Sequence, residues 1–279
     1  MKNIIAAVFA FICMACFVNA QVKVPDKALV DAFLKSKTYI VLEENPFSAF
    51  NTVVNDRIKD LWTLTPFEVI SSEEFEKKMH DSKSSFLFMS QAQMGKGEMS
   101  NYFIMNLVMG DASGNINKMP ELCVVPVSYD EVDPETYEYR FPALIKFIDY
   151  FIRYTQKNPG KDIRQIVSEN SSELRNYGLW LVGSDLAPEV NTVEKIRKIY
   201  PYPVKIVTTD DIEKAVNEGN TKVAILHKVG PEETKSGSNT VYKFIITVKE
   251  GKPLYFGDHK TVAGKPDAFL EEDFKSMAK

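Results

Sequence analysis

Short apolar runs alternate with segments of helical spacing in the first half of the chain. Residues 39–42 and 67–70 are apolar enough for buried strands. Between them the apolar side chains recur every three or four residues, as in a helix with one buried face: Phe50, Val53, Val54, Ile58 and Leu61. Pro66 follows and prevents that helix from continuing. The pattern predicts strand, helix and strand in that order.

The second half of the chain repeats this pattern. Residues 66–77 match residues 203–214 at an offset of 137, and nearly every aligned pair is identical or chemically similar. Residues 179–182 and 204–207 again read as strands, with helical spacing between them at Val190, Val193, Ile196 and Ile199. The repetition predicts two copies of one structural unit.

Each copy is expected to end in three consecutive strands. Residues 85–90 and 102–109 have strand character in the first copy, as do residues 222–228 and 241–249 in the second. Glycine turns at 110–114 and 250–252 then lead into a last strand. The predicted fold class is α/β with mixed sheets, built from two tandem repeats of a β-α-β-α-β-β-β unit.

A helix is expected before each unit. Residues 26–34 precede the first copy, and residues 143–155 and 162–177 precede the second. Residues 130–141, which contain Asp133 and several tyrosines, are predicted to form a surface connection. We therefore expect a first repeat over residues 21–140 and a second, with the central helices, over residues 141–279.

Paired acidic residues follow hydroxyl residues at matching places in both copies. Ser71 and Ser72 precede Glu73 and Glu74, and residues 208–211 read Thr-Thr-Asp-Asp. These pairs could be mistaken for catalytic carboxylates. Hydroxyl groups accept hydrogen bonds from free amides at a helix start, and acids favour the positive end of the helix dipole. We interpret both segments as helix starts.

The amino terminus has the pattern of an export signal. One positive charge at Lys2 is followed by an apolar run over residues 4–18 and by Ala20, which predicts a signal peptide over residues 1–20 with cleavage after Ala20. Lipid attachment at Cys16 is the less favoured alternative. After cleavage Cys123 remains alone, in an apolar segment typical of a strand, and no internal disulfide can form. No membrane span is expected in the mature chain.

Charge and histidine content restrict the possible functions. The chain carries 34 Lys and Arg against 38 Asp and Glu, a net charge of −4, which argues against nucleic acid as a partner. It has three histidines: His80 is placed at a helix end, His227 at a strand end and His259 in a loop. Their spacing matches no zinc motif, and no Gly-x-Ser-x-Gly segment is present. We expect no cofactor and no metal.

The loops between the paired strands are candidate partner-binding segments. Gly95, Lys96 and Gly97 resemble a phosphate-binding loop in composition, but the segment connects two strands and opens no helix. The corresponding loop of the second copy is longer, and loops on a duplicated scaffold can diverge in binding. The candidate partner-binding residues are Gly95, Lys96, Gly97, Gly230, Glu232, Glu233 and Lys235.

Aromatic side chains concentrate in the middle of the chain. The group consists of Tyr129, Tyr137, Tyr139, Phe141, Phe147, Tyr150, Phe151 and Tyr154. They can seal the joint between the two units, or they can form an exposed patch that docks a protein or a glycan. Solvent exposure of these rings separates the two interpretations.

The order of elements resembles a known α/β unit. The strand and helix of residues 67–79, the strand of residues 84–91 and the strand that ends at the turn of residues 109–116 are similar in order to the amino-terminal domain of TolB and to the curli-secretion protein family. The second copy departs from this pattern, with Lys249, Glu250 and Gly251 in place of the fuller turn. The resemblance implies an envelope protein that binds other proteins or assembles with them.

These features favour an exported, non-catalytic binding or assembly factor of the bacterial cell envelope. Its partner is expected to be an envelope protein or glycan. The alternative is a secreted hydrolase that acts on envelope material. A cleft that contains His227 or His259 with an acid and a serine would favour the hydrolase, and a surface without convergent titratable groups would favour the binding factor.

Overall fold

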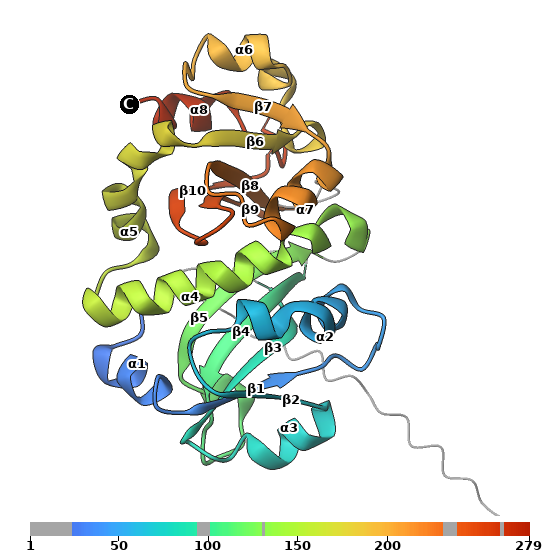
Figure 1. The fold of residues 1–279 in the computed structure, drawn as a ribbon, viewed down its shortest axis with the longest axis vertical. Helices are drawn as coiled ribbons and strands as arrows, with labels where there is room; N and C mark the ends of the chain where they lie inside the picture. The colour runs from blue at the N-terminus through green and yellow to red at the C-terminus, as the bar shows by residue number, and fades with distance from the viewer. Residues whose placement is uncertain (1–23, 94–100, 130–131, 231–238, 263–264) are drawn as a thin grey trace, which may run out of the picture.

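The computed structural model describes residues 24–93, 101–129, 132–230, 239–262 and 265–279. Two five-stranded sheets lie one above the other, with a long helix between them (Figure 1). The first unit contains α1 (Lys27–Phe33), β1 (Lys37–Val41), α2 (Ala49–Leu61), β2 (Phe67–Ile70), α3 (Ser72–Lys78), β3 (Ser84–Ala92), β4 (Tyr102–Met109) and β5 (Glu121–Tyr129).

The remaining elements belong to the central helices and to the second unit. They are α4 (Phe141–Lys157), α5 (Ile163–Asn170), β6 (Gly178–Val182), α6 (Val193–Arg197), β7 (Val204–Val207), α7 (Thr209–Asn217), β8 (Val223–Val229), β9 (Thr240–Thr247), β10 (Pro253–Lys260) and α8 (Glu271–Met277). Within the described residues no helix combines the length and the apolar character needed to cross a membrane.

The two sheets have the same topology. Their strand orders are β2-β1-β3-β4-β5 and β7-β6-β8-β9-β10. In each sheet the first strand lies between two parallel neighbours, and the last three strands form an antiparallel meander. Equivalent residues pair in equivalent ways, with Ile40 opposite Val69 and Leu181 opposite Ile206. The predicted α/β fold class is confirmed.

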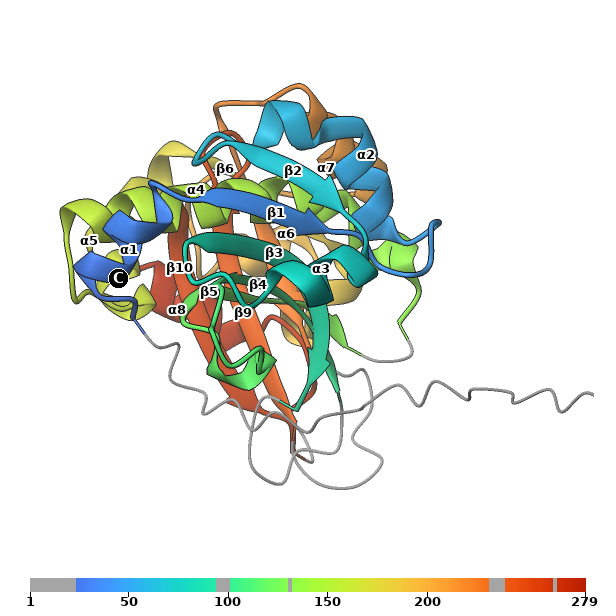
Figure 2. The ribbon, with the colours of Figure 1, turned by 90° about the horizontal axis from the view of Figure 1, so that it is seen from below.

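Helices cover both faces of each sheet. On the first sheet α2 packs on the face that carries Leu87, whereas α3 packs on the face that carries Phe86 and Phe88. Figure 2 shows α3 across the outer face of this sheet. The second sheet has α6 and α8 on its outer face and α7 on the face toward α4. The two units are therefore stacked with α4 in the layer between them.

Helix α4 belongs to the cores of both units. Its Phe147 ring lies 5.9 Å from the ring of Phe244 in β9. At the start of the helix the Phe141 ring lies 5.9 Å from that of Phe50 in α2. One continuous apolar cluster consequently includes residues from both sheets. Of the eight clustered rings, Tyr139, Phe141, Phe147 and Phe151 are buried in this layer and seal the joint, whereas Tyr129, Tyr137, Tyr150 and Tyr154 are half-buried.

The acidic pairs are helix caps, as predicted. The Ser71 hydroxyl accepts from the Glu74 amide, and the Glu74 carboxylate accepts from the Ser71 amide in return. Thr208 and Asp211 form the same reciprocal arrangement at the start of α7. These bonds satisfy amides that have no partner inside the helix.

Three segments differ from the prediction. Residues 134–140 form two short 3₁₀ turns, not a purely exposed connection, and Arg140 is only 3% exposed. Its guanidinium lies 2.6 Å from the Asp185 carboxylate just after β6, so the connection is fixed to the second unit by a buried ion pair. Helix α5 ends at Asn170 and a 3₁₀ segment, Ser171–Asn176, continues to β6. Helix α6 is shorter than its apolar spacing suggested, because Pro188–Val190 forms a separate turn.

Candidate functional site

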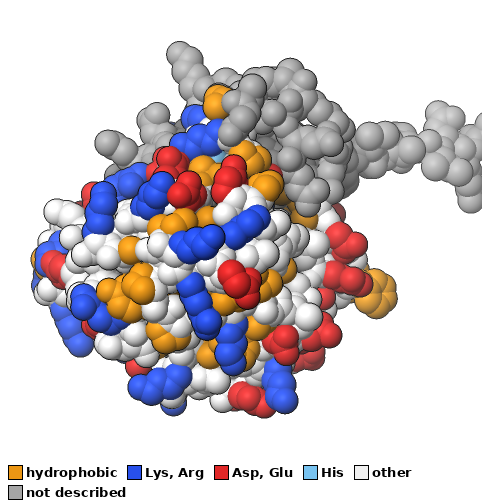
Figure 3. Space-filling model, turned by 90° about the horizontal axis from the view of Figure 1, so that it is seen from above, with side chains coloured by type: hydrophobic (Ala, Val, Ile, Leu, Met, Phe, Trp, Pro, Cys, Tyr) orange, Lys and Arg blue, Asp and Glu red, His pale blue; other side chains and the backbone are white. Residues whose placement is uncertain are grey.

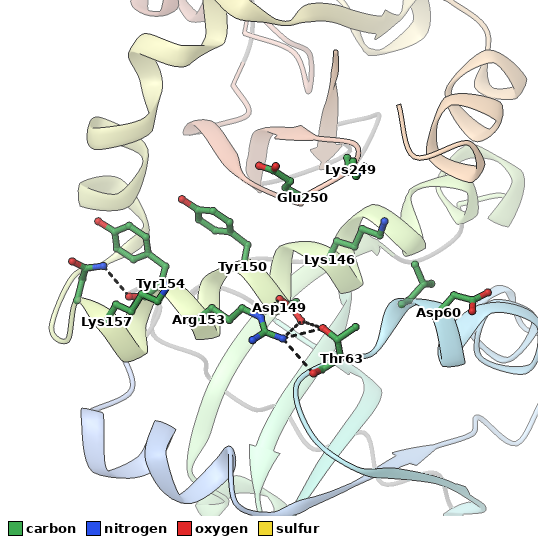
Figure 4. A pocket seen from close by; sticks show the side chains of 12 residues that line it. Asp60, Thr63, Lys146, Asp149, Tyr150, Arg153, Tyr154, Lys157, Lys249 and Glu250 are labelled. Atoms are coloured by element: carbon green, nitrogen blue, oxygen red, sulfur yellow. Dashed lines mark hydrogen bonds and ion pairs between the residues drawn. The ribbon is translucent and has the colours of Figure 1, made fainter. Parts of the chain in front are cut away.

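A groove of about 550 Å³ runs along α4 where the two units meet (Figure 4). One wall comes from the end of α2 and the segment after it, and the other comes from the turn between β9 and β10. The twelve lining residues are Asp60, Leu61, Thr63, Lys146, Asp149, Tyr150, Arg153, Tyr154, Lys157, Asn158, Lys249 and Glu250. Three segments that are distant in sequence therefore form one site.

Two tyrosines of α4 form the aromatic part of the groove. Tyr150 and Tyr154 are one helical turn apart, and their rings lie 6.0 Å from each other with an angle of 23° between the planes. Helix α5 holds both hydroxyl groups: the Asn170 amide donates to the Tyr150 oxygen over 3.0 Å, and the Tyr154 hydroxyl donates to Glu169. The rings are fixed in place before any ligand arrives.

An ion pair closes one side of the groove. Arg153 lies 2.6 Å from Asp149 through its Nε atom, and its Nη2 atom donates to the Thr63 hydroxyl over 3.0 Å. The Thr63 hydroxyl in turn donates to Asp149. This set of contacts ties α4 to the segment between α2 and β2. Figure 4 shows the three side chains joined in this way.

Five other charged side chains of the groove have no ion-pair partner among the described residues. They are Asp60, Lys146, Lys157, Lys249 and Glu250. Burial lowers the pKa of Lys146 below its ordinary range, and the nearby charges of Arg57 and Lys249 lower it further. Like charges near a partly desolvated amine disfavour its protonated form. An anionic group in the groove would relieve this repulsion.

Gly251 allows the β9–β10 turn to lie directly against α4. Its φ angle is +65°, and a Cβ atom at this position would lie 2.2 Å from the Lys146 carbonyl carbon and from the Phe147 amide nitrogen. Only glycine tolerates both the backbone conformation and the contact. This close approach places Lys249 and Glu250 beside Lys146 (Figure 4).

The histidines do not contribute to the groove. His227 is fully buried within β8, and its Nε2 atom lies 2.8 Å from the Pro126 carbonyl oxygen of the first unit. His259 lies in β10 and not in a loop as predicted, with its Nε2 atom 2.8 Å from the Pro266 carbonyl oxygen. His80 is exposed after the end of α3. Within the described residues no group of three or more His, Cys, Asp or Glu side chains is placed to hold a metal ion.

A second cluster of titratable groups lies inside the second unit. The Lys243 amine, fully buried in β9, contacts both carboxylate oxygens of Asp273 at 2.6 Å. The Tyr255 hydroxyl donates to the same carboxylate over 2.6 Å. Burial lowers the pKa of Lys243 and raises that of Tyr255. We interpret this cluster as structural, because it fastens α8 to the sheet.

Cys123 is a structural residue of the first unit. It lies in β5, as its apolar neighbours predicted, and its side chain is buried without a disulfide partner. Burial raises the pKa of its thiol. A thiol without a nearby cation in an apolar environment is unreactive.

Most of the predicted partner-binding residues lie outside the described part of the chain. Gly95, Lys96, Gly97, Glu232, Glu233 and Lys235 belong to this group, and their role stays a prediction. Gly230 is described and buried, with Val241 beside it. The residues that flank the two loops are in contact, since the Tyr102 hydroxyl donates to the Thr240 carbonyl oxygen over 2.7 Å. Tyr102 and Thr240, the described residues next to these segments, therefore lie at the same end of the molecule.

Comparison with protein-family models, curated proteins and solved structures found no match to this chain. The resemblance of each unit to the amino-terminal domain of TolB and to the curli-secretion family thus stays a prediction from the order of elements.

Proposed function

We propose that this protein is an exported, non-catalytic binding factor of the bacterial cell envelope and that its ligand occupies the groove along α4. The observation that carries the proposal is the groove itself, which combines a fixed tyrosine pair with five charged groups free of ion pairs among the described residues. Concave sites with convergent polar groups are the usual places for ligands. The apolar segment of residues 4–18 with Ala20 supports export.

The lining of the groove favours binding over hydrolysis. The described residues that line it include no histidine, serine or cysteine. Nucleophilic catalysis by a side chain needs a nucleophile within hydrogen-bond reach of a free base, and Asp149, the carboxylate beside the Thr63 hydroxyl, is already paired with Arg153. His227 and His259, the histidines expected in a hydrolytic cleft, are buried elsewhere with backbone carbonyl partners. The secreted hydrolase is therefore the less supported alternative.

The surface charge is compatible with a binding factor that avoids nucleic acid. On the face seen from above in Figure 3, acidic and basic side chains are interspersed and no large field of one sign is visible. Binding of nucleic acid relies on clustered positive charge. This face offers no such cluster.

Photo-crosslinking in the native envelope tests the proposal. A benzophenone side chain is introduced at Lys157, at one end of the groove, and separately at Asp60 on the opposite wall. The matched control carries it at exposed Lys198 after α6, on the outer side of the second unit. We expect the same adduct from positions 157 and 60 and no such adduct from position 198. Equal labelling at all three positions, or none in the groove, would contradict the proposal.

A further inference from the structure

The composition of the groove indicates the chemical class of its ligand. Among the twelve described lining residues Leu61 is the one aliphatic side chain, and the others are polar, charged or tyrosine. Peptide-binding grooves rely on apolar pockets for anchor side chains, on an open strand edge, or on aromatic rings that dock a proline-rich segment. The described lining has no strand edge and a single aliphatic side chain, and its two tyrosines lie among charged groups that a proline-rich segment would leave without partners. A ligand rich in hydroxyl groups fits this lining better than a peptide does.

The tyrosine pair suits a ring with an apolar face. Tyr150 and Tyr154 are nearly parallel, and both are held at their hydroxyl ends by α5, so their rings are presented without further loss of conformational freedom. Aromatic side chains supply large contact area beside polar groups. The C–H faces of a sugar ring pack against such surfaces while its hydroxyl groups reach the neighbouring polar atoms. Asp60 and Glu250 are available to accept hydrogen bonds from those hydroxyl groups.

The amines of the groove indicate an acidic group on the ligand. Lys146 projects from α4 and Lys249 from the β9–β10 turn, and neither contacts a carboxylate among the described residues. Arg57 adds a third positive charge near Lys146. A carboxylate or phosphate between the two lysines would make charge-assisted hydrogen bonds with both. The neighbouring Arg153 cannot serve this purpose, since Asp149 already neutralises it.

We propose that the groove binds an acidic saccharide, with a sugar ring on Tyr150 and Tyr154 and its carboxylate or phosphate between Lys146 and Lys249. This inference rests on the proposed function and specifies the ligand of the same site.

Titration calorimetry of the mature chain, residues 21–279, tests the inference with defined probes. The acidic saccharides are trigalacturonate, sialyllactose and mannose 6-phosphate, which separate carboxylate from phosphate. Maltotriose supplies sugar without acid, and triglutamate supplies acid without sugar. We expect at least one acidic saccharide to bind with a dissociation constant below about 10 mM and more tightly than both control probes. Higher salt weakens this binding because the lysines are partly exposed.

Variants locate the binding. Lys249→Gln, at an exposed position, and Tyr154→Leu are each expected to weaken binding of the acidic saccharide by about tenfold, the size of one charge-assisted hydrogen bond or one ring contact. Lys198→Gln and Tyr202→Leu are the matched controls, outside the groove, and leave it unchanged. The thermal midpoint of each variant shows that the fold is retained.

Three results would overturn the inference. If triglutamate binds as tightly as the acidic saccharides, the ligand is an acidic peptide and not a sugar. If maltotriose binds as tightly as the acidic saccharides, the acidic group contributes nothing to the affinity. Binding by none of the three acidic saccharides up to about 10 mM would reject the ligand class. In each case the crosslinks from positions 157 and 60 still decide whether the groove is the binding site.

Discussion

His227 lies in the joint between the two units, where burial keeps its ring neutral. The Pro126 carbonyl can only accept, so the Nε2 atom that faces it at 2.8 Å carries the proton. Burial, with the nearby charge of Arg140, lowers the pKa of His227 to about 3. The ring therefore remains uncharged in the folded protein at pH values where a solvated histidine is protonated.

Stability is expected to fall on acidification because of this residue. Below about pH 6.5 the unfolded chain binds a proton at His227, whereas the folded chain does so only near pH 3. Between these values the residue removes about 1.4 kcal/mol of unfolding free energy per pH unit. His227→Gln retains a donor for the Pro126 carbonyl and does not titrate. Urea unfolding at pH 4 to 7 should therefore show a shallower slope for the variant.

The other titratable groups are common to both proteins, so the difference between the two slopes isolates His227. Parallel curves for the variant and the unsubstituted protein would contradict the assignment.

His227 is predicted at a strand end and His259 in a loop because a polar residue inside a buried strand is difficult to recognise from sequence. The predicted strand of residues 222–228 has His227 near its end, where the apolar pattern stops, and His259 follows Gly257 and Asp258, which favour a loop. In the structure β8 and β10 continue through these residues because backbone carbonyls of Pro126 and Pro266 satisfy the rings. The Pro126 carbonyl is about one hundred residues from His227 in sequence, and the Pro266 carbonyl follows β10 after a turn. The spacing of residues in the sequence therefore does not reveal these partners.

At the scale of single elements, α8 is too short to be stable alone and depends on its contacts with the sheet. Helices of fewer than about 12 residues are marginal in water. Phe274 fills the apolar core beneath α8, and Asp273 accepts from the Leu270 amide over 2.7 Å while it holds Lys243. The carboxylate of Asp273 thus satisfies the helix start and the buried amine together.

Asp273→Ala is expected to lower the free energy of unfolding by about 3–5 kcal/mol, because it leaves the Lys243 amine buried without a counter-charge. The double variant Lys243→Met with Asp273→Leu should recover part of this loss, since an apolar pair replaces the ion pair while the Tyr255 hydroxyl and the Leu270 amide still lack their acceptor. Denaturant unfolding followed by circular dichroism measures both. Glu271→Gln, in an exposed pair on the same helix, is the control and should change stability by less than about 0.5 kcal/mol. A similar loss in the single and double variants would contradict this account.

The strands and caps of the repeat were predictable because their signals are local. Strands β2 and β7 have the predicted bounds, since a proline lies before each of them and a hydroxyl residue with acids follows. The groove was not predictable in the same way. The spacing of Tyr150 and Tyr154 places them on one face of a helix, but their approach to Thr63 and Lys249 depends on how α4 packs between two sheets.

At the scale of the whole molecule, the shared helix α4 joins two similar units into one cooperative structure. Residues of both sheets contact α4 within one apolar cluster, and the buried pair of Arg140 and Asp185 adds a polar link. Separation of the units would expose Phe147 and the rings around it. The two units are therefore expected to unfold together.

The two tryptophans test this cooperativity, since each unit has one. Trp62 lies in the core of the first unit and Trp180 in β6 of the second. The variants Trp180→Phe and Trp62→Phe each leave a single fluorophore, so that fluorescence reports one unit at a time. Each variant is expected to give the same urea midpoint by fluorescence and by circular dichroism, as two-state unfolding requires. Separate midpoints for the two probes within one variant would show independent units.

Gly251 limits how this molecule can acquire new specificity. Because a side chain there would meet the backbone of α4, any substitution would displace the turn and carry Lys249 and Glu250 away from the groove that they line. Positions 249 and 250, by contrast, are exposed and can be exchanged without disturbing the core. Directed evolution of the site should accordingly keep this glycine constant and diversify its two preceding neighbours.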